Sequence, residues 1–385
     1  MRRSDSPEST SPVRAVVCLH VPDSVFGAVR MGYGRLQARM AAAGHSLEIL
    51  TPERFPWVSR PHPRVAVVLY PLAVAWYLWR RRSAYDIALF HSYAGWVFHL
   101  AKGRTRTMTV FHGIETLQFQ ALDADHRAQG RRLSWRFRVT HGWLMDRWLA
   151  WSSRRSDGVT CLNSEEQRFL LDRGWATESR LSLLRHGVPD GFFVDDRVYA
   201  PQATRILFVS QWVERKGLRF LVSAFTELAR RRPDVQLWCV GTRNGDERVL
   251  ADFPEDVRSR VTNVPTITQD EVTGWYQRAD LFVHTAINEA YGRAIAEAMA
   301  GGLPIVCTPV GVARELLRDG ESVLTVPIGE PEAVVAAIER LADDQALRTR
   351  LGRGARAAAA TLRASSRDNQ MFELIVATAR RRSDR

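Results

Sequence analysis

The stretch Leu281-Phe-Val-His-Thr-Ala-Ile-Asn-Glu-Ala-Tyr-Gly-Arg-Ala-Ile-Ala-Glu-Ala-Met-Ala-Gly-Gly-Leu-Pro-Ile-Val-Cys307 decides the fold of this chain. Its two ends, 281–284 and 305–307, are short apolar runs that are typical of buried strands. Between them, 294–300 is strongly helix-forming, Gly301 and Gly302 can cap the helix, and Pro304 prevents its continuation. Strand, helix and strand in this order predict one unit of a parallel sheet.

The same alternation extends outward over most of the chain. Near-continuous apolar strands separated by helices imply parallel sheets that are covered on both faces, which is the α/β class. A loop with Gly27, Gly32 and Gly34 is expected after the first strand, followed by a helix over Leu36 to Ala43. The predicted strands are 15–20, 47–50, 87–90, 107–111, 158–162, 205–210, 235–240, 281–284, 305–307 and 323–326.

The rhythm of strands and helices restarts at Arg205, which divides the chain into two Rossmann-like domains. We expect a disordered polar tail over 1–12, a first domain over 13–194, a linker over 195–204 and a second domain over 205–364. In open α/β sheets ligands bind at the carboxyl ends of the strands, so a cleft between the two domains is the expected site.

The composition of the chain bears on its cellular compartment and on its binding partners. The formal net charge of +12 suits an anionic partner: a nucleotide diphosphate, nucleic acid or an anionic membrane surface. The four cysteines lie far apart in apolar runs, as buried thiols in a reducing cytoplasm do. Met1 to Pro12 lacks the apolar region of a secretory signal. The apolar run Val65 to Trp79 is interrupted by Pro71, so a buried or interfacial helix is expected there.

Two carboxylates, Glu289 and Glu297, lie eight positions apart in the opening stretch. On a continuous helix this spacing gives a rise of roughly 12 Å and a rotation of about 80°. It excludes the roughly 5 Å separation of a retaining glycosidase pair. The two acids suit the two ends of one elongated ligand; the alternative is an alanine-rich core helix whose acids face water.

Further candidate residues follow strand ends. Lys216 and Gly217 form a turn that can place an ammonium and backbone N–H groups against a phosphate, or merely a solvated turn. His112 precedes Gly113 at another strand end, where functional side chains concentrate. Asp123-Ala-Asp125 has a form that some metal-dependent transferases use, but its setting predicts a polar helix start, and the ten histidines lack metal-ligand spacing. No metal is expected.

In combination, these elements resemble the retaining GT-B glycosyltransferases of family 4, also called glycosyl transferases group 1. The resemblance covers about residues 13 to 345 and is strongest from 205 to 327. Its motifs, in family order, are the N-terminal glycine loop, Gly44-His45, Tyr85-Asp86-Ile87, Val110-Phe-His-Gly113, Asp157-Gly-Val-Thr-Cys-Leu-Asn-Ser164, Arg185-His-Gly-Val-Pro189, Lys216-Gly217, Val240-Gly241 and the Glu289-to-Glu297 segment with Gly301-Gly302-Leu303-Pro304.

The resemblance implies roles for individual residues. Lys216 would contact the donor diphosphate, Glu297 the ribose hydroxyls and Glu289 the donor sugar, and His112 would approach that sugar from the first domain. Catalysis would rest on His112, Lys216 and Glu289. The implied donor-binding set is Gly34, Ser210, Gln211, Lys216, Gly241, Glu289, Ala290, Tyr291, Gly292, Arg293 and Glu297, and the acceptor side has Gly32, Tyr33 and His91.

The chain departs from the family pattern at three places. Ser210-Gln211 stands where the family has Gly-Arg, which removes a cation that Arg215, an arginine of the first domain, or Arg293 can replace. The segment after Glu289 reads Ala-Tyr-Gly-Arg-Ala, and His186 replaces an asparagine. These changes leave the donor's identity open.

The resemblance therefore predicts a metal-independent hexosyltransferase without a cofactor. Its donor would be a UDP- or GDP-sugar, its acceptor a glycan or lipid-linked hydroxyl, and its final segment, 365–385, a helix that returns to the first domain. The basic, tryptophan-rich stretch 127–155 suits docking on an anionic membrane, here the inner membrane face, or packs within the domain. The alternatives are a GT-B phosphorylase or epimerase and a non-catalytic basic binding protein; no nucleic-acid motif is present.

Overall fold

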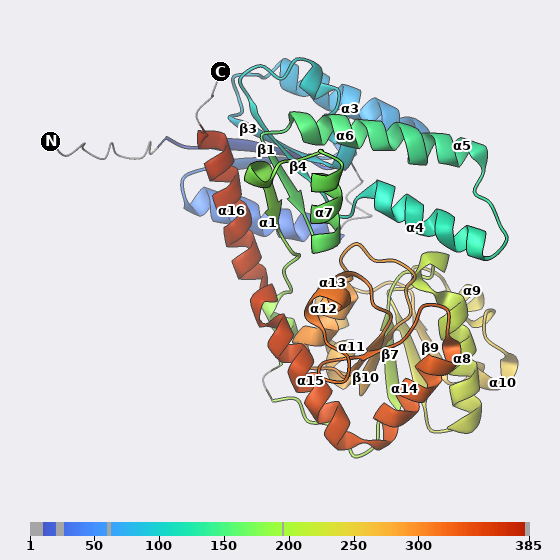
Figure 1. Cartoon of the computed structure of the whole chain (residues 1–385). Helices are drawn as coiled ribbons and strands as arrows, with labels where there is room; N and C mark the ends of the chain where they lie inside the picture. Colours follow the sequence, from blue (N-terminus) through green and yellow to red (C-terminus); the bar gives the residue numbers. More distant parts are fainter. Residues whose placement is uncertain (1–10, 21–26, 60–62, 195, 382–385) are drawn as a thin grey trace.

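The computed structural model describes residues 11–20, 27–59, 63–194 and 196–381. The predicted α/β class is correct: the chain has two six-stranded parallel sheets (Figure 1), with strand orders β2-β1-β3-β4-β5-β6 and β12-β11-β10-β7-β8-β9. The first sheet contains β1 (Arg14–Cys18), β2 (Ser46–Leu50), β3 (Ile87–His91), β4 (Arg106–Val110), β5 (Gly158–Cys161) and β6 (Leu181–Leu183). The second contains β7 (Arg205–Val209), β8 (Gln236–Val240), β9 (Val261–Val264), β10 (Leu281–His284), β11 (Ile305–Cys307) and β12 (Leu324–Thr325).

The helices lie between the strands and on both faces of the sheets. Those of the first part of the chain are α1 (Gly27–Ala42), α2 (Pro56–Ser59), α3 (Pro63–Trp79), α4 (Glu115–Ala128), α5 (Trp135–Phe137), a π-helical segment (Arg138–Leu144), α6 (Met145–Arg155) and α7 (Ser164–Asp172). The second part has α8 (Leu218–Arg231), α9 (Asp246–Leu250), α10 (Glu255–Arg258), α11 (Gln269–Arg278), α12 (Arg293–Ala300), α13 (Gly311–Leu316), α14 (Pro331–Asp343), α15 (Gln345–Ala359) and α16 (Ala364–Arg380).

Side-chain alternation along each strand explains why both faces of each sheet are covered. In β1, Val16 and Cys18 pack with α3, whereas Ala15 and Val17 pack with α1 and α16. The second sheet repeats this plan, with α8 and α14 on one face and α11, α12 and α15 on the other. Each domain therefore has an apolar layer on either side of its sheet.

Three sequence-based expectations need correction. The short strands β6 and β9 were not predicted; each lies at an edge of its sheet and carries few apolar residues. The predicted glycine loop is largely helical, since α1 already begins at Gly27 and contains Gly32 and Gly34. Packing outweighs the poor helix propensity of glycine here, because Tyr33, Leu36 and Met40 of α1 are fully buried.

Further sequence-based predictions concern the chain ends and the apolar run before Arg80. Residues 1–10 of the expected tail, linker residue 195 and the terminal residues 382–385 lie outside the described residues. The run from Val65 to Trp79 forms most of α3, with Pro71 inside the helix. Within the described ranges, none of the helices combines the length and hydropathy needed to cross a bilayer.

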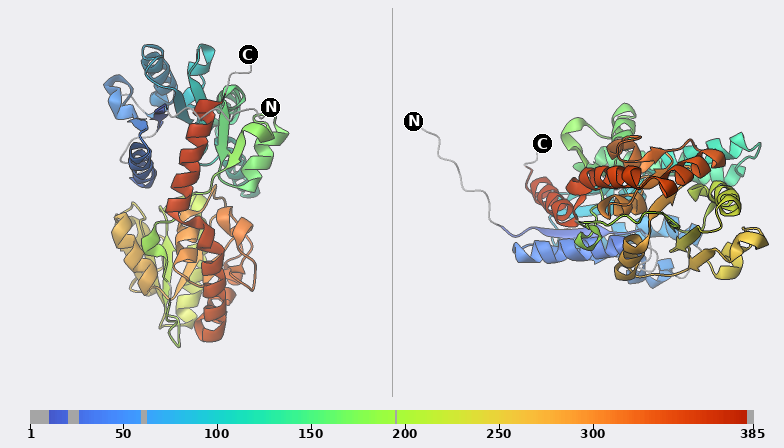
Figure 2. Two further views of the ribbon diagram at one scale, coloured as in Figure 1. Left: turned by 90° about the vertical axis from the view of Figure 1, so that its left-hand side faces the viewer. Right: turned by 90° about the horizontal axis from the view of Figure 1, so that it is seen from below.

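The C-terminal helix joins the two domains. α16 extends upward from the second domain and lies along α1 of the first (Figures 1 and 2), where Met371 and Ile375 complete the apolar core. Arg35 of α1 forms an ion pair with Asp368 at 2.8 Å, and the Arg39 guanidinium lies over the Phe372 ring at 4.4 Å.

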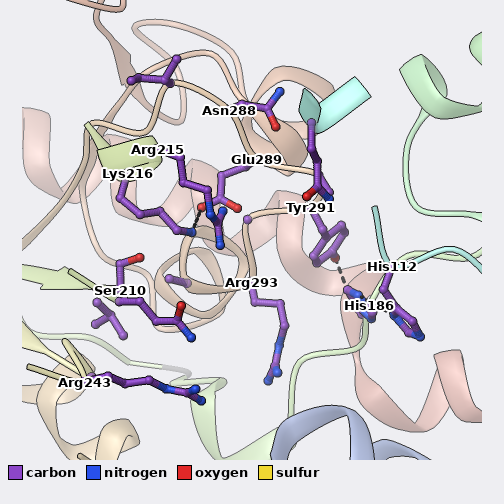
Figure 3. A pocket seen from close by; sticks show the side chains of 18 of the residues that line it. His112, His186, Ser210, Arg215, Lys216, Arg243, Asn288, Glu289, Tyr291 and Arg293 are labelled. Carbon is purple, nitrogen blue, oxygen red and sulfur yellow. Dashed lines mark hydrogen bonds and ion pairs between the residues drawn. The ribbon is translucent and has the colours of Figure 1, made fainter. Parts of the chain in front are cut away.

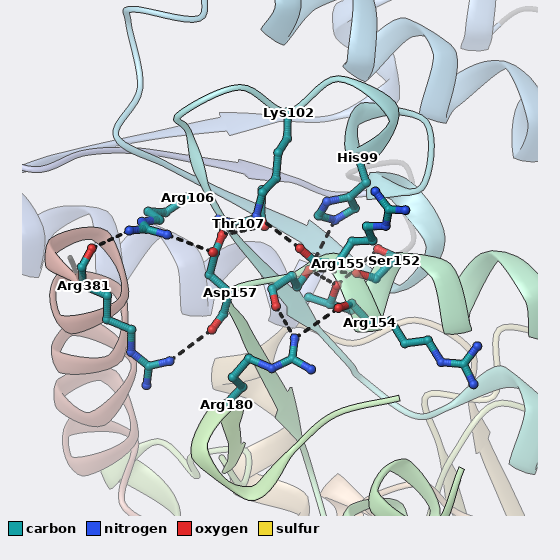
Figure 4. Close-up of polar contacts among 12 residues, drawn as sticks. His99, Lys102, Arg106, Thr107, Ser152, Arg154, Arg155, Asp157, Arg180 and Arg381 are labelled. Carbon is teal, nitrogen blue, oxygen red and sulfur yellow. Dashed lines mark hydrogen bonds and ion pairs between the residues drawn. The ribbon is translucent and has the colours of Figure 1, made fainter. Parts of the chain in front are cut away.

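A polar cluster around Asp157 holds the end of this helix against the first sheet (Figure 4). The Asp157 carboxylate pairs with Lys102 at 2.9 Å and with Arg106 at 3.1 Å, and it accepts a hydrogen bond from the Thr107 N–H. Arg381, next after α16, donates to the Asp157 carbonyl at 3.1 Å. Burial alone would raise the pKa of Asp157, but the Lys102 and Thr107 hydrogen bonds lower it below its usual value.

We predict that Asp157→Asn lowers the free energy of unfolding by about 1–3 kcal/mol at pH 7, because the partly buried Lys102 and Arg106 lose their counter-charge. A folded-state pKa below the unfolded one contributes stability above the unfolded value of about 3.9 and loses it as the pH falls further. The difference between mutant and wild type should therefore shrink below about pH 4 in urea titrations. Asp256→Asn, in an exposed pair with Arg230, is the control and should change little.

Candidate active site

A cleft of about 1370 Å³ lies where the carboxyl ends of the two sheets face each other. The loops after β4, β7, β8 and β10 contribute to it, as expected for ligand sites in open α/β sheets. Figure 3 shows Lys216, Glu289 and Arg293 of the second domain on one side and His112 and His186 on the other. The residues brought together here come from segments far apart in the sequence, from Met31 to Glu297.

Lys216 and Glu289 form a buried ion pair at the centre of the second-domain wall. His284, at the end of β10, lies 3.1 Å from the same carboxylate oxygen through its Nε2 atom. Burial alone would raise the pKa of Glu289, but Lys216 and His284 hold that pKa well below its usual range. Glu289 is therefore a carboxylate, and the Lys216 ammonium is held in one place beside it.

The turn that carries Lys216 requires glycine at its next position. Gly217 has a φ of 68°, and a Cβ atom there would lie 1.9 Å from the Thr285 carbonyl oxygen. The Thr285 hydroxyl bonds the Lys216 carbonyl at 3.2 Å, and the Ile287 N–H donates to the Arg215 carbonyl at 3.0 Å. The loops after β7 and β10 are thus joined directly through their backbones.

Glu297 lies one turn into α12, which begins after Gly292, while Glu289 lies in the preceding loop. Glu297 is only 7% exposed, and it accepts a hydrogen bond from the Tyr276 hydroxyl at 3.0 Å. Arg293 lies 3.3 Å from its other oxygen. Burial raises the pKa of Glu297, against the lowering effect of Arg293 and Tyr276. The alternative of two acids facing water is therefore wrong, since the Glu289 and Glu297 side chains are only 10% and 9% exposed.

Four cations line the second-domain wall: Arg215, Lys216, Arg243 and Arg293. Arg215 and Arg293 were expected as replacements for the missing family arginine, and both line the cleft; among the described lining residues no arginine of the first domain does so. Arg243 was not predicted. In the sequence, its position two residues after Gly241 is only a weak signal. In the structure, its φ of 58° marks an unusual turn.

Three histidines and a tyrosine form a hydrogen-bonded row at the first-domain side. His112 lies 3.2 Å from His91 and 3.3 Å from His186, and the Tyr33 hydroxyl lies 2.6 Å from His91. Burial lowers the pKa of His112 to about 3, with a further lowering from Arg367, so the ring is neutral at pH 7. His186 was noted only as a departure; Tyr291 donates to its carbonyl at 2.8 Å.

The remaining predicted residues divide into two groups. Ser210, Gln211, Gly241, Ala290, Tyr291 and Gly292 line the cleft together with the residues above. Gly32, Tyr33 and Gly34 lie in helix α1, from which only Met31 is among the described lining residues, and His91 is buried beneath the cleft. Their predicted contacts with ligand stay predictions.

The two walls touch at several points. Asn163 of the first domain donates to the Ala290 carbonyl, and Arg185 pairs with Glu315 at 2.9 Å. Across the cleft from these contacts, Asp125 of α4 pairs with Arg219 of α8 at 2.8 Å. Asp125 therefore lies inside a helix, not at its start as expected, and is engaged by an arginine.

Comparisons with known proteins agree with this arrangement. Residues 203–344 match the family model described as glycosyl transferases group 1. The chain is 31% identical over 205 residues to the lipopolysaccharide core biosynthesis glycosyltransferase LpsE of Rhizobium meliloti (strain 1021), covering 51% of this chain and 57% of that protein. It is 32% identical over 177 residues to the D-inositol 3-phosphate glycosyltransferase of Pseudarthrobacter chlorophenolicus, covering 44% of this chain and 39% of the relative. The matches thus span about half the length of these curated relatives.

Solved structures share the fold over nearly the whole chain. A sucrose-phosphate synthase from Thermosynechococcus elongatus has a TM-score of 0.73 at 19% identity, covering 95% of this chain and 99% of that one. Anabaena HepE in complex with UDP-glucose has a TM-score of 0.68 at 14% identity, covering 94% and 99%. Residues 203–344 thus resemble the glycosyltransferases of group 1, and the two facing sheets give the chain the GT-B fold.

Proposed function

We propose that this protein transfers a hexose from a nucleotide sugar, UDP- or GDP-linked, to a hydroxyl acceptor with retention and without a metal ion or cofactor. The observation that carries the proposal is the group of four cations on one wall of the cleft, next to two buried carboxylates. Cations suit a diphosphate, and a buried carboxylate suits a pair of sugar hydroxyls.

The geometry supports a distinct role for each group. Lys216, Arg215 and Arg243 would balance the charge that develops on the diphosphate as its bond to the sugar breaks. Glu297, with its two oxygens already oriented by Tyr276 and Arg293, would accept hydrogen bonds from the ribose. Glu289 would hold the donor sugar through the oxygen not engaged by Lys216 and His284.

The proposed transfer needs no nucleophile from the protein. The bond between the anomeric carbon and the diphosphate oxygen breaks, and the acceptor oxygen bonds to that carbon from the same face. The acceptor proton moves to the departing diphosphate oxygen. The neutral His112 would contact the transferred sugar as a hydrogen-bond partner, and it carries no charge that competes with the diphosphate cations.

The wider role is inferred from the relatives. One is named for lipopolysaccharide core biosynthesis, and another is a phosphatidyl-myo-inositol mannosyltransferase of Mycolicibacterium smegmatis. Both names concern envelope glycans or glycolipids. We therefore infer a role in cell-envelope, lipopolysaccharide or exopolysaccharide synthesis, carried out in the cytoplasm.

The direct test is a thermal-shift panel of UDP, GDP, ADP and their sugars. A nucleotide at about a hundred times its Kd should raise the stability of the folded protein by about 2.7 kcal/mol. If none of these compounds raises the melting temperature, the transferase proposal is wrong, and the basic binding protein becomes the better description.

We expect Glu297→Gln to raise the Kd of the nucleotide found in that panel by about tenfold to a hundredfold. The reason is the loss of charge-assisted hydrogen bonds to the ribose, each worth about 1.5–3 kcal/mol. Isothermal titration calorimetry measures the change, and Glu321→Gln, on an exposed side chain, is the matched control. An unchanged Kd in a folded Glu297→Gln protein would refute the ribose role.

Lys216→Met should lower kcat by about a hundredfold to a thousandfold, as expected when one preorganised donor to the departing group is removed. A coupled assay that follows the release of the nucleoside diphosphate from the donor sugar measures kcat. Arg318→Met removes a cation from an exposed site and should leave kcat unchanged. A Lys216→Met enzyme within about threefold of wild type would contradict the charge-balancing role.

We further propose that the first domain docks on an anionic membrane. The support is a stripe of four exposed apolar side chains on α3, with a spacing of three or four residues: Val65, Val68, Leu72 and Trp76, each 43–50% exposed. Three exposed arginines, Arg80 to Arg82, follow directly, and Arg80 lies over the Trp76 ring. This is the pattern of an interfacial helix with a basic end.

The tryptophan-rich stretch adds to this surface in part. Trp135, Trp143 and Trp151 are exposed and accompanied by arginines, of which Arg147 lies 4.3 Å from the Trp143 ring centre. Trp148, in contrast, stacks on Trp96 at 5.3 Å and packs within the domain. We therefore infer that the exposed tryptophans take part in docking on the membrane, whereas Trp148 packs within the domain.

Leu72→Glu should weaken sedimentation of the protein with vesicles of phosphatidylcholine and phosphatidylglycerol by at least about tenfold, since it removes apolar burial and adds a negative charge. Wild-type binding should fall as salt is raised. Val198→Glu, at the most exposed large apolar side chain of the described residues, is the control. Equal binding to neutral phosphatidylcholine vesicles, or no effect of Leu72→Glu, would overturn the docking proposal.

A further inference from the structure

The first-domain wall of the cleft is built largely by one face of α4. Its residues recur at helical spacing and include two carboxylates, an amide, an aromatic ring and an aliphatic side chain. They are Glu115, Gln118, Phe119, Leu122 and Asp125. We call this face, with Phe137 and His141 of the adjoining segment, the α4 wall.

Aromatic rings form the outer part of the α4 wall. Phe137 stacks on His141 with ring centres 4.2 Å apart and an interplanar angle of 17°, and Phe119 lies 6.0 Å from Phe137. A Cβ atom at Gly142 would come within 2.9 Å of the Phe119 ring, so glycine allows this close packing. The backbone of residues 138–144 is π-helical, a rare form that is frequent at functional sites.

A carboxyl group with spare hydrogen-bonding capacity lies at the inner end of the wall. Ser92, whose φ is 56°, donates to one oxygen of Glu115. The other oxygen is buried and has no hydrogen-bond partner among the described residues. Burial raises the pKa of Glu115 to about 7, against the lowering effect of Ser92. Such a group can accept a hydrogen bond, or donate one when protonated.

This inner end adjoins the place of the donor sugar. A Cβ atom at Gly113 would lie 2.7 Å from the Cβ of Ala290 and 2.4 Å from the Gln118 amide nitrogen. Gly113, with the Gln118 amide beside it, therefore borders the loop that carries Glu289, and Glu115 lies two residues after Gly113. A hydroxyl bound here would be close to the reacting carbon of a donor held by the opposite wall.

The two walls differ in charge. Every Lys or Arg among the described lining residues, Arg215, Lys216, Arg243 and Arg293, belongs to the second domain. The described lining residues of the first domain include no cation, and they carry the carboxyls of Glu115 and Asp125. Asp125 is already paired with Arg219. A phosphate on the acceptor would meet carboxylates on the α4 wall, not guanidinium groups.

We propose that the α4 wall binds the acceptor as a neutral, unphosphorylated sugar ring. The apolar C–H face of the ring would lie against Phe119 and Phe137, and Glu115 and Gln118 would bond its hydroxyls. This inference rests on the proposed function, and it separates this chain from relatives whose printed names specify inositol 3-phosphate.

The size of the cleft is consistent with two ligands. Pockets that enclose one small ligand usually measure about 300–1,000 Å³, and this cleft measures about 1370 Å³. A nucleotide sugar along the cationic wall therefore leaves room for a second ring on the α4 wall.

The test uses saturation-transfer difference NMR on the full chain with its best-binding nucleoside diphosphate present. The probes are methyl glucoside, methyl galactoside, methyl mannoside and myo-inositol, each beside a phosphorylated counterpart: glucose, galactose and mannose 6-phosphates and inositol 3-phosphate. At least one neutral probe should bind more tightly than its phosphorylated partner. Phe137→Ala and Glu115→Gln should each raise its Kd by about tenfold, the equivalent of one aromatic contact or one charged hydrogen bond.

The controls separate this inference from the proposed function. Nucleotide affinity should be unchanged in Phe137→Ala and Glu115→Gln, and Leu100→Ala, an exposed apolar truncation outside the cleft lining, should change neither affinity. Tighter binding of the phosphorylated probes, no transfer to any neutral probe, or unchanged sugar affinity in both variants would overturn the neutral-sugar assignment while nucleotide binding persists. Loss of nucleotide binding in the wild-type protein would overturn the proposed function itself.

Discussion

The buried ion pair between Lys216 and Glu289 is the interaction on which the site depends. A buried ammonium is costly unless a charge is close by, so the loop after β7 and the loop after β10 must adopt one common arrangement. Gly217 makes this arrangement possible, because no other residue fits against the Thr285 carbonyl. The same arrangement fixes the positions of Arg215 and of the start of α12. It therefore fixes the positions of most of the residues of the cationic wall.

The opposite wall, which belongs to the first domain, differs in charge. His91, His112 and His186 are close together, and burial keeps them neutral, so the first domain offers hydrogen bonds without positive charge. Farther out, carboxyls and aromatic rings replace cations altogether. The cationic wall of the second domain would then bind the charged donor, and the wall of the first domain would bind the uncharged acceptor. The C-terminal helix α16 and the Asp157 cluster keep the domains joined behind this cleft.

Much of the fold could be predicted from the sequence because buried parallel strands are nearly continuous apolar runs. All ten predicted strands correspond to strands of the structure within about two residues. The misses have physical causes: β6 and β9 are edge strands with little apolar pattern, and α1 includes glycines whose helical state depends on the packing of Tyr33, Leu36 and Met40. Of the residues that line the cleft, Lys216, Glu289 and Glu297 were singled out from their turn and spacing, and Arg215 and Arg293 from a departure from the family pattern. Arg243 and Glu115 were not predicted, since neither belongs to a motif.

By itself the sequence determined the alternation of strands and helices, the two-domain division and the acids at a helix start, because each depends on neighbours along the chain. Only the tertiary structure decided which acid pairs with Lys216, that Glu297 is buried against Tyr276 and Arg293, and that the first-domain wall is free of cations among its described residues. Lys216 and Glu289 are 73 positions apart in the sequence, and Gly113 and Ala290, which border each other at the cleft, are far more distant still. Charge and burial are properties of that spatial neighbourhood, and no local pattern encodes them.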